Sequence, residues 1–149
     1  MIADTATSVS QNSTPQANAK IRQDMEQRLA AFRSDDKNEL ISKRLQELDR
    51  EWDVERTLQT NFATLSLVGL SLATQLNKKW FALALGVPAF MVQHALQGWC
   101  PPLPVLRKLG VRSAREISDE RFALKAMRGD FDEAAQSRNA DALIKAVRS

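Results

Sequence analysis

A histidine and a cysteine stand close together in "HALQGWCPPLPVLRKLG", residues 94–110, and each is the only one of its type in the chain. A Cys/His nucleophile needs contact between thiolate and imidazole and a third group that orients them. A structural metal site needs about four ligands, and His94 and Cys100 are the only soft ones. We therefore predict no catalytic residue, no metal and no cofactor, and interpret Cys100, with His94, as a candidate reactive thiol. Arg107 and Lys108 are near enough in sequence to lower the thiol pKa.

Two runs of sequence with almost no charge lead up to this pair. Residues 57–77 carry no ionisable side chain, and residues 80–106 carry no formal charge if His94 is neutral. A membrane-spanning helix needs about 20 mainly apolar residues to cross about 30 Å of hydrocarbon. Because only Lys78 and Lys79 interrupt the two runs, they predict an antiparallel transmembrane hairpin.

The hairpin occupies residues 57–106 in this interpretation. Its helices cover residues 57–76 and 80–97. An exit segment, residues 98–106, follows Gly98, and its three prolines favour an extended path.

Tryptophans, lysines and small residues have the placement that a membrane hairpin predicts. Indole rings and basic side chains favour the membrane interface. We assign interface positions to Trp52, Trp80, Trp99, Lys78, Lys79, Arg107 and Lys108. Small residues four apart allow helices to approach closely. We assign helix packing to Gly69, Ala73, Ala82 and Gly86.

Polar residues in the first run leave an alternative open. They follow one stripe of the helix: Thr57, Asn61, Thr64, Ser71 and Gln75. The stripe is typical either of hydrogen bonds between packed helices or of a path for a polar solute. A neighbouring stripe is apolar: Leu58, Phe62, Leu65, Leu72 and Leu76. A buried hairpin of a soluble helical bundle would also show such a composition.

The flanking regions differ from the hairpin in charge and periodicity. Residues 1–17 are mostly small and polar, which predicts a disordered tail. Residues 18–56 have apolar positions three and four apart among many charges, which predicts helices. Residues 107–149 return to this pattern, with a capping box formed by Ser113 and Glu116. We predict both flanking regions to be cytoplasmic, amphipathic or polar helices.

The stretch "QHALQGWCPPLPVLRKLGVRS" after an apolar hairpin resembles the YgaP-like transmembrane domain family, bacterial inner-membrane domains of unknown function. The segments "LQELDREWDVERTL" and "EISDERFALKAMRGDF" are similar to stand-alone members. The resemblance implies two membrane helices with a Cys-Pro pair near the end of the second. Some relatives carry a rhodanese domain, for which this sequence has no room.

These observations predict an all-α, multi-pass protein of the bacterial inner membrane. The balance of basic residues places both termini in the cytoplasm. The leading function is a non-enzymatic anchor or assembly module. Its expected partners are the lipid bilayer, further copies of itself and an unknown protein bound through the flanking helices, with no nucleic acid. The alternatives are a sulfur or redox role at Cys100 and, if the hairpin is not inserted, a soluble helical interaction protein.

Overall fold

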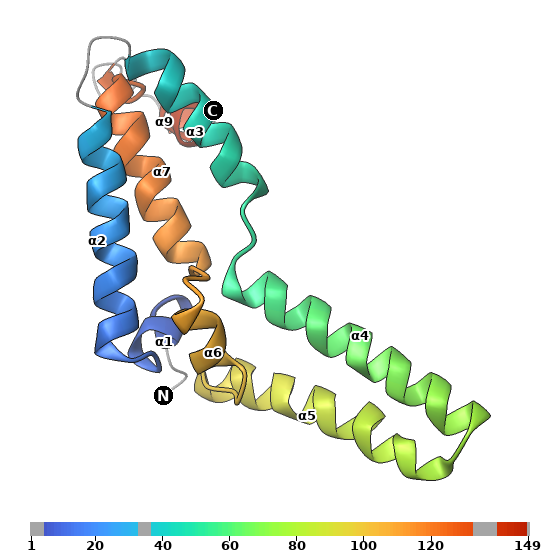
Figure 1. Cartoon of the computed structure of the whole chain (residues 1–149). Coiled ribbons are helices and arrows are strands. Elements are labelled where there is room, and N and C mark those ends of the chain that lie inside the picture. The colour runs from blue at the N-terminus through green and yellow to red at the C-terminus, as the bar shows by residue number, and fades with distance from the viewer. Residues whose placement is uncertain (1–4, 33–36, 133–139, 149) are drawn as a thin grey trace. The chain divides into compact units, whose positions relative to one another are not determined.

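The computed structural model describes residues 5–32, 37–132 and 140–148 (Figure 1). Its helices in chain order are α1 (Thr5–Gln11), α2 (Pro15–Ala31), α3 (Lys37–Arg50), α4 (Val54–Gln75), the 3-10 turn η1 (Lys78–Trp80), α5 (Phe81–Gln97), α6 (Leu103–Lys108), α7 (Ala114–Arg128) and α9 (Ala140–Arg148). The described residues contain no strand, so the prediction of an all-α chain is confirmed.

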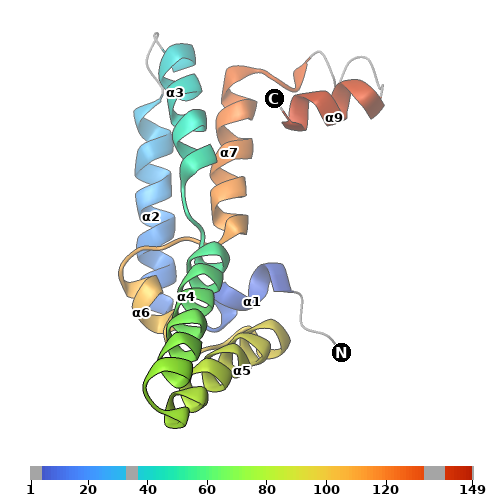
Figure 2. The ribbon, with the colours of Figure 1, turned by 90° about the vertical axis from the view of Figure 1, so that its right-hand side faces the viewer.

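The central feature is a hairpin in which α4 and α5 run antiparallel, side by side (Figures 1 and 2). Asp53 caps α4, because its carboxylate accepts a hydrogen bond from the Arg56 backbone N–H at 2.6 Å. Asn77 caps the turn in the same way, accepting from the Lys79 N–H at 2.9 Å. Asp53 therefore fixes the start of α4, three residues before the predicted position, and Asn77 fixes the start of η1.

The prediction that this hairpin crosses a membrane is wrong. Among the helices of the described residues, none is both long and apolar enough to form a span. At 17 residues α5 is short, and the 22 residues of α4 are interrupted by many hydroxyl and amide side chains. The predicted multi-pass location in a bacterial inner membrane, with cytoplasmic termini, is wrong for the same reason.

The chain after α5 differs from the extended path that its prolines predict. Gly98 ends α5 in the left-handed conformation, at φ 70°, and Pro102 then caps α6. A proline fits the start of a helix because a backbone N–H at that position would have no hydrogen-bond acceptor within the helix, so its absence costs nothing. The segment expected to leave the hairpin in extended form therefore turns and becomes a short helix.

Residues 1–21 and 52–115 form one compact unit, unit 1. Its buried apolar core combines α1, α4, the turn after α5 and α6: Val9, Val54, Leu58, Phe62, Cys100 and Leu103. The prediction of disorder over residues 1–17 fails for α1 and the start of α2, because Val9 is buried in this core. Asn12 Nδ2 also donates to the Gln97 carbonyl, at 3.3 Å.

Residues 22–51 and 116–149 form the second compact unit, unit 2. Its core unites α3 and α7 through five buried side chains: Ile41, Leu45, Leu48, Ile117 and Leu124. The carboxylate of Glu120 is fully buried and binds Arg44 Nε at 2.9 Å and Arg28 Nη2 at 3.3 Å. Because Arg28 belongs to α2 and Arg44 to α3, this carboxylate ties both helices to α7.

A buried lysine attaches the last helix to unit 2. The Lys125 ammonium on α7 donates to the Val147 carbonyl at 2.8 Å, in the last turn of α9. Burial lowers the pKa of Lys125. The apolar side chains of Leu143, Ile144 and Val147 are exposed, so the Lys125 hydrogen bond is a polar contact between α7 and α9.

Candidate functional site

His94 lies in the last turn of α5, and its side chain is buried. Its Nδ1 atom is shielded from solvent and has no hydrogen-bond partner among the described residues. Burial lowers the His94 pKa, and the negative charge of Glu55 partly opposes this shift. The imidazole is therefore neutral near pH 7 and is not a general acid at that pH.

Cys100 is completely buried among the apolar side chains of the unit 1 core. Burial raises the pKa of the thiol, and a hydrogen bond from the Leu103 backbone N–H offsets this only in part. A protonated, inaccessible thiol is a poor nucleophile. In the part of the chain that the structure describes, no three His, Cys, Asp or Glu residues are grouped to hold a metal ion.

The tryptophans and lysines predicted to lie at a membrane interface are exposed or partly exposed. Trp52, Trp80 and Trp99 are partly exposed. The Arg56 guanidinium stacks over the Trp52 ring, 4.6 Å from its centroid. Lys78 and Lys79 are exposed in the hairpin turn.

Arg107 departs most from its predicted position, while its neighbour Lys108 is exposed. The Arg107 guanidinium is buried and donates to Asn18 Oδ1 at 2.7 Å and to the Val111 carbonyl at 3.2 Å. These bonds join the start of α2 to the segment after α6. The side chain is therefore a structural tie within unit 1 and is not exposed to a lipid headgroup.

The small residues assigned to helix packing separate into two pairs. Gly69 and Ala73 are buried on α4, and a Cβ added at Gly69 would lie 2.8 Å from the Ala84 backbone nitrogen. Ala82 is exposed, and a Cβ added at Gly86 would meet nothing within 4 Å. The close approach of α4 and α5 therefore occurs between Gly69 and Ala84, a partner that sequence spacing did not indicate.

The polar stripe of α4 does not pack against α5. Asn61, Thr64, Ser71 and Gln75 are exposed, and Thr57 is half-buried. Thr57 and Thr64 donate their hydroxyls to backbone carbonyls one turn earlier, each at 2.8 Å. Neither of these hydroxyls bridges to α5.

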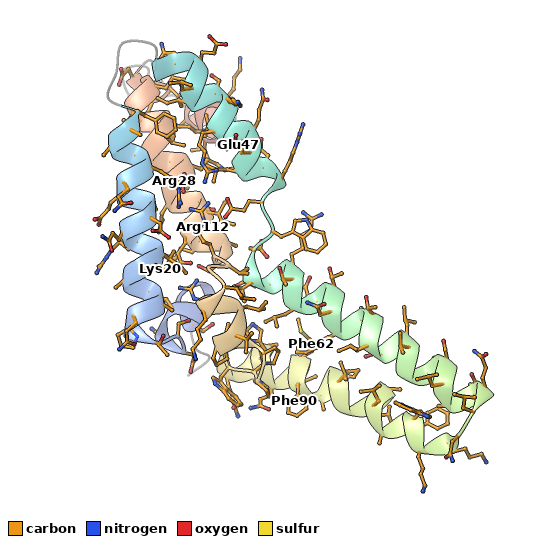
Figure 3. The ribbon with its side chains drawn as sticks, viewed as in Figure 1. Lys20, Arg28, Glu47, Phe62, Phe90 and Arg112 are labelled. Atoms are coloured by element: carbon orange, nitrogen blue, oxygen red, sulfur yellow. The ribbon has the colours of Figure 1, made fainter. Side chains whose placement is uncertain are left out.

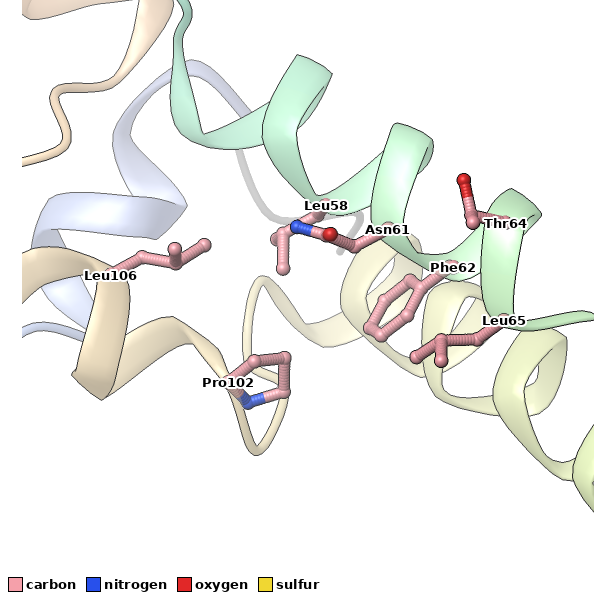
Figure 4. A pocket seen from close by; sticks show the side chains of 7 residues that line it. All are labelled: Leu58, Asn61, Phe62, Thr64, Leu65, Pro102 and Leu106. Carbon is pink, nitrogen blue, oxygen red and sulfur yellow. The ribbon is translucent and has the colours of Figure 1, made fainter.

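A mainly apolar cleft of about 310 Å³ opens beside the stripe, between α4 and the start of α6 (Figure 4). Its lining is Leu58, Asn61, Phe62, Thr64, Leu65, Pro102 and Leu106. Figure 3 shows Phe62 on the side of α4 that faces α5. The cleft thus lies where the base of the hairpin meets the chain returning from α5.

An apolar row runs from this cleft along α4 to the tip of the hairpin. Its members are three to four residues apart and share one face: Leu65, Val68, Leu72 and Leu76. We name these four residues the α4 seam. Leu65 is 45% exposed, Val68 46% and Leu76 72%, whereas Leu72 is half-buried, so α5 leaves most of the seam uncovered.

Large apolar side chains are also exposed elsewhere on the hairpin. They include Leu67, Leu70, Phe81, Leu85, Phe90, Val92 and Leu96. Isolated exposed apolar residues are ordinary, but large contiguous apolar patches mark interaction surfaces. Part of this surface could be read from the sequence, because Leu65, Leu72 and Leu76 already form a stripe beside the polar one.

No protein-family model matches the chain, and neither the curated proteins nor the solved structures contain a match to it. The resemblance to the YgaP-like family therefore stays a prediction. The apolar surface of the hairpin and the cleft at its base are the features on which a function can be argued.

Proposed function

We propose that the protein is a non-enzymatic assembly module that associates with further copies of itself through the α4–α5 hairpin. The observation that carries the proposal is the α4 seam, most of which stays exposed beside the face of α4 that packs against α5. Burying one Leu or Val side chain fully is worth about 1.5–3 kcal/mol, so leaving this row in water is unfavourable.

A second copy is the partner that the chemistry of the seam fits. Residues 57–77 carry no charge, so two seams can meet without burying an unpaired ion. Their spacing of three and four residues is the one by which helices interdigitate in coiled coils and four-helix bundles. Homo-oligomers with a two-fold axis use the same patch twice, which a self-complementary apolar row permits.

The alternative sulfur or redox role at Cys100 lacks comparable support. The thiol is buried, its pKa is raised, and His94 is neutral near pH 7. A nucleophile needs a thiolate that a substrate can reach.

Sedimentation velocity over a range of protein concentrations tests the proposal. We expect the wild-type chain to associate with increasing concentration and Val68→Glu to remain monomeric with unchanged helical circular dichroism. Leu67→Glu is the matched control, because Leu67 is 66% exposed on α4 but lies outside the seam. A monomeric wild type, or equal loss of association in both variants, would rule out assembly through the seam.

A further inference from the structure

We infer that two copies pair antiparallel along the α4 seam, and that Leu76 at the hairpin tip of each copy fills the cleft at the hairpin base of the other. This inference rests on the proposed homotypic assembly. It specifies the orientation of the pair and the occupant of the cleft.

The two ends of the seam have complementary shapes. At the base, Leu58, Asn61 and Leu65 line one side of the 310 Å³ cleft. At the other end, Leu76 is 72% exposed, the most exposed member of the seam. One end of the same helix face is therefore hollow, and the other end projects.

The spacing along α4 brings the hollow and the projection together in an antiparallel pair. Asn61 and Leu76 are separated by about 22 Å of helix at 1.5 Å per residue. The midpoint between them lies next to Val68. A two-fold axis at this midpoint, perpendicular to α4, places each Leu76 opposite the partner's Asn61, so both clefts are filled by the same contact.

A parallel pair would match these features poorly. It would set one cleft against the other and leave two unfilled spaces, whereas well-packed interfaces approach the density of protein interiors. It would also bring Lys78 and Lys79 of both copies together at the tips, where like charges repel. In the antiparallel pair the lysines of each tip lie near the partner's base, which carries charges of both signs: Asp53, Glu55 and Lys108.

Disulfide trapping in the full-length chain distinguishes the two orientations. Cys100 is first replaced by alanine, and circular dichroism checks that each variant keeps its helices. Single cysteines are then introduced as Asn61→Cys, Val68→Cys and Leu76→Cys. One copy carries a size tag so that mixed dimers are resolved on non-reducing gels after mild oxidation.

The antiparallel pair predicts a specific pattern of cross-links. Val68→Cys forms a homodimer because its cysteines flank the two-fold axis. Leu76→Cys alone forms none, because its two cysteines lie about 22 Å apart, beyond the 7 Å Cα separation that a disulfide tolerates. Mixing Leu76→Cys with Asn61→Cys produces a disulfide heterodimer.

The cross-linking pattern distinguishes failure of the antiparallel pairing from failure of homotypic assembly. A Leu76→Cys homodimer without the mixed heterodimer would show a parallel pair, which overturns this inference but leaves homotypic assembly intact. Trapped Val68→Cys dimers that give no mixed Leu76–Asn61 cross-link would show that the partner's tip does not lie at the cleft, and would also overturn the inference. Absence of every cross-link, with a monomeric wild type, would reject the proposed function itself.

Discussion

The buried carboxylate of Glu120 offers a quantitative test of how unit 2 is held together. Glu120 is fully buried on α7 and binds Arg28 and Arg44. Replacing it by alanine removes the charge that neutralises both guanidinium groups. It also removes hydrogen bonds that tie α2 and α3 to α7.

The surroundings of the two arginines set the magnitude of the loss. Removing one partner of a buried ion pair costs about 3–5 kcal/mol when the remaining charge stays buried. Here the Arg28 side chain is 36% exposed, so water can solvate it. Arg44 keeps Glu47 at 3.0 Å and Glu51 at 3.7 Å. We therefore expect Glu120→Ala to lower the free energy of unfolding by about 2–3 kcal/mol, below the usual cost of a broken buried pair.

A surface ion pair between α3 and α7 supplies the control. Arg121 on α7 binds Asp49 on α3, and the Asp49 side chain is 59% exposed. Exposed pairs contribute about 0–1 kcal/mol, so Asp49→Ala should have little effect. Thermal unfolding followed by circular dichroism at 222 nm measures both variants. For a chain of about 150 residues, 1 kcal/mol shifts Tm by about 2–4 °C. Equal Tm shifts in Glu120→Ala and Asp49→Ala would refute the argument from burial.

Three further predictions concern unit 1. Gly69→Ala should destabilise the hairpin by about 1–3 kcal/mol, because its Cβ would meet the Ala84 backbone at 2.8 Å, whereas Gly86→Ala should stabilise it by about 0.5–1 kcal/mol; urea unfolding that gives both the same sign would contradict this. Because burial lowers the folded-state pKa of His94 below 6.5, its contribution to stability is present above pH 6.5 and is lost as the pH falls below that value. Tryptophan fluorescence melts between pH 7.5 and 5.5 should show this loss in the wild type and a smaller one in His94→Gln. Cys100 should react with a maleimide slowly in the native protein and quickly in urea, as an absorbance assay of free thiol can measure; equal rates would mean that the thiol is accessible.

Local features of the sequence predicted most of the helices and the hairpin. Periodic apolar residues give helical faces. The caps at Asp53 and Asn77 were not predicted, although each acts on a backbone group only two or three positions away. Gly98 ends α5 by its own backbone conformation. Such interactions depend on neighbours in the chain, so they are visible in the sequence.

The features that sequence reasoning missed depend on residues far apart in the chain. A basic residue after an apolar run predicts a lipid interface for Arg107, yet Arg107 binds Asn18, 89 positions away. Ala84 meets Gly69 through the relative register of two helices, which the spacing within one helix does not fix. Burial of Cys100 likewise requires α1, α4 and α6 to converge on it.

Absence of charge was the observation that most misled the sequence interpretation. A run without charges lacks only the side chains that are most costly to place in hydrocarbon. The lack of charge gives no information on the number of hydroxyl and amide side chains in the run, or on the length of the helix that forms. At 1.5 Å per residue the 17 residues of α5 extend about 26 Å, less than the roughly 30 Å of a bilayer core.

The same polar residues of α4 are compatible with contact between protein helices. The Thr64 and Ser66 hydroxyls each donate to a carbonyl one turn earlier in α4, at 2.8 Å, and Thr74 does so at 3.2 Å. A hydroxyl that is satisfied within its own helix needs no water molecule or partner atom as an acceptor, so a second helix can cover it at little cost. Of these three residues, Thr64 lies beside the α4 seam, so it presents a methyl group and a satisfied hydroxyl to whatever packs there. This is the surface that antiparallel pairing of two hairpins would bury.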